Sequence, residues 1–249
     1  MERTCIGRSA MPRLPRLSLA NSTQHVIQRG NNHLPCFFCV DDYELYLDYL
    51  EEAIDKYDVL LHAYCLMPNH IHLLMTPLSS DGISRVLQDL GRRYVRAINH
   101  KYNRTGTLWE GRYHSCLIEN NTQIIDMYRY IEMNPVRNEI VNKPESYKWS
   151  SYSCNALGQH DCFIIPHNEY LKLGIERESR SHEYKKLNQI ELDKIKLRRI
   201  REATQSNRVY GSDNFIYWIE KELSIRIRKK KAGRPKLQEY CLGLFFLSL

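Results

Sequence analysis

The fold of this chain depends on one stretch, Met67-Pro68-Asn69-His70-Ile71-His72-Leu73-Leu74-Met75. Residues 59–66 form an apolar run before it, and Pro68-Asn69 supplies a tight connection, so the two runs predict an antiparallel strand pair. Side chains alternate along a strand, so His70 and His72 should share one face while Ile71 enters a core on the other. Two imidazoles on one face form half of a metal site.

The flanking sequence predicts alternating strands and helices. Strands are expected over residues 23–29 and 112–118, beside the pair 59–66 and 70–76. Apolar residues recur at helical spacing in three segments, which begin at Asp41 or Asp42, at Gly82 and at Asn121-Thr122 and end near residues 57, 102 and 134. This order predicts an α+β fold, a ferredoxin-like antiparallel sheet with helices packed on one face.

The charge is unevenly distributed along the chain. The net charge is +7 over 249 residues, and residues 191–236 hold fourteen Lys and Arg against six Asp and Glu, a net of +8. A basic segment beside a near-neutral body favours an acidic polymer as partner, foremost nucleic acid, although a solvated charged helix is the simpler alternative. We therefore expect a basic arm (1–20), a main domain (21–140), a wrapping connection (141–184), a basic helical appendage that binds DNA (185–236) and an apolar tail (237–249).

Other features narrow the class of protein. No apolar run is long enough to span a bilayer, and the basic start lacks the apolar core of a secretory signal, so we expect a cytoplasmic, nucleoid-associated protein without a membrane partner. The eight cysteines show no disulfide framework. Cys36 and Cys39 form a lone Cys-x-x-Cys without a matching second pair, so a structural role is favoured over zinc.

The third predicted helix can complete the histidine half-site. Tyr130 and Asn134 are four residues apart and can project from one helical face. The amide oxygen of Asn134 suits a hard divalent cation, and a tyrosine beside such a cation can act as a nucleophile. From spacing alone, a tyrosine that only covers the sheet is the slightly favoured interpretation of Tyr130, and Tyr128 is an equal candidate for the nucleophile.

Four segments in order resemble the REP-associated tyrosine transposases, which are single-tyrosine transposases with a histidine-hydrophobic-histidine (HUH) motif. The segments are His62–Leu74, Val26–Asn31, Leu108–Tyr113 and Tyr130–Arg137. The likeness covers about residues 20–155, and a weaker one extends through residues 211–213 and 233–235.

The resemblance implies an HUH catalytic domain over residues 21–140, in which His70 and His72 hold Mg²⁺ or Mn²⁺. Tyr130, which directly precedes the Ile-x-x-Asn-Pro segment, would attack single-stranded DNA, form a 5′-phosphotyrosine and release a 3′-hydroxyl. Asn134 stands where related insertion-sequence enzymes often carry glutamine, and either residue offers an amide oxygen as third ligand.

Basic and aromatic residues are the expected DNA contacts. Gly233-Arg234-Pro235 resembles the core of an AT-hook, which enters the minor groove, and phosphate and stacking contacts are expected from other residues. The full set is Arg29, Arg92, Arg96, Trp109, Arg112, Tyr113 and Arg234.

The leading hypothesis is a DNA strand transferase that acts, as a monomer or homodimer, on single-stranded or hairpin DNA at hairpin-flanked repeats. Two alternatives remain: a domesticated sequence-specific DNA-binding protein without transposition, and a replication or mobilisation nickase of the same chemistry.

Overall fold

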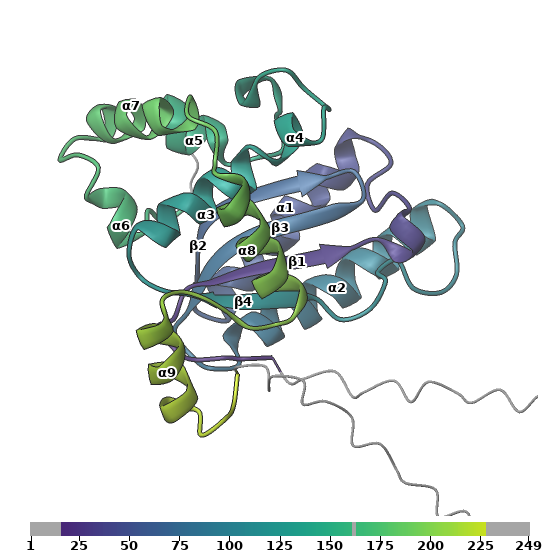
Figure 1. Cartoon of the computed structure of the whole chain (residues 1–249). Helices are drawn as coiled ribbons and strands as arrows, with labels where there is room; N and C mark the ends of the chain where they lie inside the picture. The colour runs from purple at the N-terminus through teal and green to yellow at the C-terminus, as the bar shows by residue number, and fades with distance from the viewer. Residues whose placement is uncertain (1–15, 161–162, 228–249) are drawn as a thin grey trace, which may run out of the picture.

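A five-stranded sheet forms the centre of the molecule in the computed structural model, which describes residues 16–160 and 163–227 (Figure 1). The strand order is β2-β3-β1-β4-β5; the first four strands are antiparallel and β5 pairs parallel with β4. The order of β1 to β4 is that of a ferredoxin-like sheet. The strands are β1 (Gln24–Arg29), β2 (Val59–Met67), β3 (His70–Pro77), β4 (His114–Ile118) and β5 (Val209–Tyr210).

The expected hairpin is confirmed. Met67 pairs with His70 in the β2–β3 register, so Pro68 and Asn69 make the connection. On its other side β3 pairs with β1, where Arg29 lies opposite His70 and Ile27 opposite His72. The histidine strand is therefore an inner strand of the sheet, hydrogen-bonded along both edges.

Helices connect and cover the strands. The first two long helices begin and end close to the predicted residues, whereas the third stops at Glu132 and a separate short helix starts at Asn134. The helices are α1 (Val40–Lys56), α2 (Gly82–Lys101), α3 (Thr122–Glu132), α4 (Asn134–Arg137), α5 (Tyr152–Leu157), α6 (Asn168–Leu171), α7 (Arg177–Asn188), α8 (Lys194–Gln205) and α9 (Asp213–Glu222), with 3₁₀ turns η1 (Asn31–His33) and η2 (Pro144–Ser146).

The α+β class is confirmed, but the expectation that helices cover only one face is wrong. Figure 1 shows α1 and α2 behind the sheet and α3 and α8 in front of it, and two separate cores fill these layers. The physical reason lies in β3, where Ile71 and Leu73 are buried toward α1 and α2 while Leu74 is buried toward α3. A strand that is apolar on both faces needs a cover on both.

The C-terminal part packs on the sheet as well. The described residues of 141–184 include α5, α6 and the first part of α7. Helix α7 begins at Arg177 rather than near residue 185 as expected, because the residues that it buries, Ser181, Tyr184 and Asn188, are mostly polar. Helix α8 lies over β1, β4 and β5, and Val209 of β5 pairs with Leu117 of β4. Most of the basic arm, Arg234 and the apolar tail lie outside the described residues. In the described part, no helix is both long and apolar enough to cross a bilayer.

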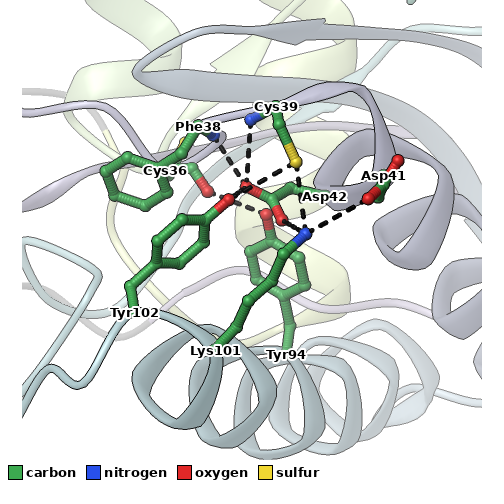
Figure 2. Close-up of polar contacts among 8 residues, drawn as sticks. All are labelled: Cys36, Phe38, Cys39, Asp41, Asp42, Tyr94, Lys101 and Tyr102. Atoms are coloured by element: carbon green, nitrogen blue, oxygen red, sulfur yellow. Dashed lines mark hydrogen bonds and ion pairs between the residues drawn. The ribbon is translucent and has the colours of Figure 1, made fainter.

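Cys39 lies in a polar network that joins the start of α1 to the end of α2 (Figure 2). The buried carboxylate of Asp42 accepts hydrogen bonds from the Cys39 amide, from Lys101 Nζ at 2.8 Å and from Tyr102 Oη at 2.9 Å. The thiol of Cys39 contacts the same lysine and tyrosine. The geometry is that of a helix cap fixed to its neighbouring helix, which accords with a structural role for this cysteine.

Candidate active site

The two histidines of β3 face α3. Ile71 between them is fully buried on the opposite face, as the strand alternation predicts. The rings of His70 and His72 are 5.0 Å apart between centroids and nearly perpendicular. His72 is 2% exposed, and His70 is half-buried. The pair therefore forms a small polar patch between the sheet and the helix that carries Tyr130.

A chain of hydrogen bonds from α8 determines which nitrogen of His72 is free. Thr204 donates its hydroxyl proton to the Ile200 carbonyl at 2.9 Å, so its oxygen must accept from His25 Nδ1 at 3.0 Å. His25 Nε2 is then unprotonated and accepts from His72 Nδ1 at 2.8 Å. The lone pair of His72 Nε2 is left for a ligand.

The same reasoning applies to His70. Its Nδ1 lies 2.6 Å from Asn69 Oδ1, which can only accept, so Nδ1 carries the proton and Nε2 carries a lone pair. Burial, together with the charges of Arg29 and His33, lowers the pKa of His70 to about 4. Burial and neighbouring positive groups also place the pKa of His72 well below its ordinary value. Both imidazoles are therefore neutral at pH 7, the form that binds a metal.

Of the two candidate tyrosines, only Tyr130 contacts the histidines. Its ring lies 5.8 Å from that of His72 and 5.6 Å from that of His25, both edge-on. Among the described residues its hydroxyl has no hydrogen-bond partner. Tyr128 is fully buried, and its hydroxyl accepts from the His167 amide at 3.1 Å. Burial places the pKa of Tyr128 well above its ordinary value, so the geometry favours Tyr130 over Tyr128 as a nucleophile.

Asn134 follows the break between α3 and α4. The two helices are separate, so Asn134 is not on one continuous helix with Tyr130 as expected. Its amide oxygen accepts a hydrogen bond from Asn138 Nδ2. An amide oxygen has two lone pairs, so one remains for a cation. Among residues 16–160 and 163–227, no group of three or more His, Cys, Asp and Glu side chains has metal-binding geometry. The role of Asn134 as a third ligand therefore stays a prediction.

Comparisons with known proteins show what the chain is similar to. Residues 18–134 match the family model described as "Transposase IS200 like". Over this stretch the chain is similar to the IS200-like transposases. The matched region contains the histidine strand, Tyr130 and Asn134.

Two known proteins with similarity to this chain are REP-associated tyrosine transposases by name. A Haemophilus influenzae protein named as a REP-associated tyrosine transposase is 26% identical over 113 residues, which span 41% of this chain and 64% of the relative's length. The solved structure of a REP-associated tyrosine transposase bound to a REP hairpin superposes with a TM-score of 0.52. That structure is 16% identical, and the match covers 63% of this chain and 93% of the other, so it supports the fold. The resemblance to REP-associated tyrosine transposases is confirmed.

Apart from Arg234, which lies outside the described residues, the residues expected to bind DNA lie in different parts of the structure. Arg29 lies beside His70 and His72. Burial is the main cause of the lowered pKa of both histidines, and the charge of Arg29 lowers it further. Arg92 and Arg96 are exposed on α2, on the far side of the sheet, where they line an open depression with Gln88 and His100. A DNA strand at the histidine face cannot contact this depression without passing around the sheet.

The remaining expected DNA contacts, Trp109, Arg112 and Tyr113, lie in the loop before β4 and differ in exposure. Trp109 is 6% exposed and packs against Tyr46 and Tyr94 in the core, so its expected stacking on DNA bases is wrong for this conformation. Arg112 is exposed, and Tyr113 is half-buried under the guanidinium of Arg16 at 3.7 Å. The large apolar area of Trp109 explains its burial, since an indole in a helix–sheet layer stabilises the core.

The sequence reasoning missed three residues at this site. His25 is fully buried on β1, Thr204 lies on α8, and Arg137 lies on α4 against Tyr130. Arg137 belongs to the Asn-Pro-Val-Arg segment of the matching motif. His25 lies two residues before Ile27, which is paired with His72, so His25 is on the same face of the sheet as His72. These signals were present in the sequence; the contribution of Thr204 had none, because it is 179 residues from His25.

Proposed function

We propose that this protein is a transposase that cleaves and rejoins single-stranded DNA at hairpin-flanked repeats through a covalent bond to Tyr130. The observation that carries the proposal is the contact of the Tyr130 ring with His72. In this site both imidazoles are neutral, and the tyrosine hydroxyl has no hydrogen-bond partner among residues 16–160 and 163–227. The family match and the names of the relatives support a transposase role.

The donor set fits a divalent cation. His70 Nε2 and His72 Nε2 each hold a lone pair, and Asn134 Oδ1 would be the third protein ligand. A bound Mg²⁺ or Mn²⁺ would neutralise the charge of the scissile phosphate and orient it for in-line attack. The hydrogen-bond chain from Thr204 through His25 keeps His72 in the tautomer that this requires.

The reaction exchanges one phosphoester for another. The oxygen of Tyr130 forms a bond to phosphorus, and the bond from phosphorus to the 3′ oxygen breaks. The 3′ oxygen leaves with the electron pair and takes up a proton as a hydroxyl, while the phenolic proton passes to solvent. Attack by a 3′-hydroxyl on the phosphotyrosine reverses the exchange and rejoins the strands without an external energy source, because each step makes one phosphoester and breaks another.

The test is cleavage of labelled hairpin oligonucleotides with single-stranded flanks in the presence of Mn²⁺. The label on the 5′-phosphate side should migrate with the protein after denaturation, and peptide mapping should place it on Tyr130. Tyr130→Phe should abolish both cleavage and adduct, whereas the matched control Tyr128→Phe should retain both.

Two results would contradict the proposal. A Tyr130→Phe protein that cleaves like the wild type removes the tyrosine from the mechanism. A wild-type protein that binds hairpins with equal affinity in Mn²⁺ and in EDTA, and forms no adduct with any of them, is a domesticated DNA-binding protein instead.

A further inference from the structure

Arg137 lies directly on the proposed nucleophile. Its guanidinium carbon is 4.6 Å from the centroid of the Tyr130 ring, and the same group donates a hydrogen bond to the Tyr130 backbone carbonyl. The break after Glu132 starts the new helix α4, whose last residue is Arg137. The side chain is half-buried, so this position is defined by packing rather than by solvent.

Within the described part of the chain, this guanidinium has no acidic partner. Other arginines of the described chain form ion pairs, as Arg93 does with Glu52 and Arg129 with Asp126, but among residues 16–160 and 163–227 no carboxylate pairs with Arg137. Burial lowers the pKa of Arg137 to about 10, so the group is still charged at neutral pH. A partly buried charge without a counter-ion is costly, and proteins retain such a charge where a ligand neutralises it.

The groups around Arg137 do not supply a negative charge to balance it. Burial is the main cause of the lowered pKa of His25 and of His72, and the charge of Arg137 is a further cause for both. The guanidinium therefore acts on these two histidines while it lies on the Tyr130 ring. Arg29 acts on His72 from β1. The acid nearest in sequence, Glu139, is exposed and forms no ion pair among the described residues. Glu132, on the other side of the helix break, is fully buried among Ser151, Asn155 and Tyr184 and belongs to a different network.

We propose that Arg137 is a catalytic residue that binds the phosphate attacked by Tyr130. The inference rests on the proposed function and adds to it the group that recognises the scissile phosphate. One N–H of the guanidinium bonds to the Tyr130 carbonyl, and among the described residues no other acceptor contacts it, so its remaining N–H groups are available for phosphate oxygens. A guanidinium matches two phosphate oxygens at once and stabilises the charge that builds up as the phenol oxygen attacks.

The proposal is tested by binding without metal, where no cleavage occurs. Fluorescence anisotropy in EDTA measures the affinity for two hairpin oligonucleotides. One has the natural scissile linkage, and the other has an uncharged methylphosphonate at that linkage only. The position of the scissile linkage is known from the adduct experiment. For the wild type, the neutral linkage should weaken binding about 10- to 100-fold, as expected for one charge-assisted hydrogen-bonded contact. Arg137→Gln should weaken binding of the natural oligonucleotide by a similar factor and should bind both oligonucleotides equally.

Arg199→Gln is the matched control. Arg199 also lies over a tyrosine, Tyr210, at 5.7 Å and donates to a backbone carbonyl, that of Gly211, at 3.1 Å. This variant should keep the wild-type response to the neutral linkage. Arg137→Lys, which keeps the charge but loses the planar fork, should keep part of that response and lower the cleavage rate with Mn²⁺; it also serves if Arg137→Gln does not fold.

The results separate this proposal from the proposed function. Suppose that Arg137→Gln loses as much affinity for the neutral linkage as the wild type does, while Tyr130 still forms its adduct. Arg137 then does not bind the scissile phosphate, and only this inference fails. Arg137→Lys takes the place of the glutamine variant if that variant is unfolded. If the wild type forms no adduct, the proposed chemistry itself fails. A loss of response in Arg199→Gln equal to that in Arg137→Gln would assign the effect to total charge and overturn the proposal.

Discussion

Glu132 makes the stability of the helix that carries Tyr130 dependent on pH. Its side chain is fully buried, and its carboxylate accepts hydrogen bonds from Ser151, from Asn155 Nδ2 at 2.7 Å and from Tyr184 Oη at 2.7 Å. Burial raises the pKa of Glu132 from 4.5 to about 7, although these three hydrogen bonds oppose the change. Between these two values the folded chain binds a proton that the unfolded chain has lost.

The consequence is a loss of stability as the pH rises. The contribution of this group is fully present below pH 4.5 and declines until the pH passes about 7. Each tenfold change in proton affinity corresponds to about 1.4 kcal/mol, so the wild type should lose about 3 kcal/mol across this window relative to a chain without the titrating group. Glu132→Gln provides that chain, because its amide keeps an oxygen to accept from Ser151 and Asn155.

Urea unfolding of both proteins at pH 4.5, 6, 7 and 8 measures the difference directly. The free energy of unfolding of Glu132→Gln minus that of the wild type should increase by about 3 kcal/mol from pH 4.5 to pH 8, with unchanged m-values. The buried histidines titrate in both proteins and cancel in this difference. A difference that stays constant within about 0.5 kcal/mol over the range would refute a buried carboxyl with a raised pKa.

Two further predictions follow from the polar networks. Thr204→Val removes the acceptor for His25 Nδ1, so His72 is no longer held in one tautomer. The Mn²⁺ affinity, measured by electron paramagnetic resonance, should fall roughly 10- to 100-fold. The control Thr76→Val removes a buried hydroxyl bonded to His62 and should leave the Mn²⁺ affinity unchanged. Asp42→Asn should lower the free energy of unfolding at pH 7 by about 2 kcal/mol, because the buried carboxylate is bonded to Lys101 and Tyr102. Burial alone would raise the pKa of Asp42, but its hydrogen bonds outweigh burial and lower the pKa. The wild type therefore keeps this stabilisation above about pH 4 and loses it as the pH falls further. A variant as stable as the wild type at pH 7 would show that the network contributes nothing.

Local patterns predicted the elements of the sheet well. The alternation of His70, Ile71 and His72 correctly assigned each side chain to a face, and Pro68-Asn69 correctly located the hairpin. The prediction failed for α7, whose buried stripe is largely polar, and for the number of helical layers. The layers could have been inferred, since a strand as apolar as β3 on both sides needs two covers.

The site was predicted in part. The motif brought His70, His72 and Tyr130 into one hypothesis, and the structure brings them into contact, but their catalytic roles stay predictions. Helical spacing could not choose between Tyr128 and Tyr130. The fold separates them, because one hydroxyl is bonded to the His167 amide and the other is unbonded among the described residues.

The sequence by itself determined what depends on neighbours along the chain: the strand pair, the face of each histidine and the family motif. Only the tertiary structure decided what depends on distant partners. Thr204 reaches His72 through His25 because α8 packs over β1, and Arg137 reaches Tyr130 because the helix breaks after Glu132. The physical reason is that alternation and helical spacing are properties of the backbone, whereas a tautomer, an unpaired charge and a free hydroxyl are set by whichever groups the fold brings within hydrogen-bonding distance.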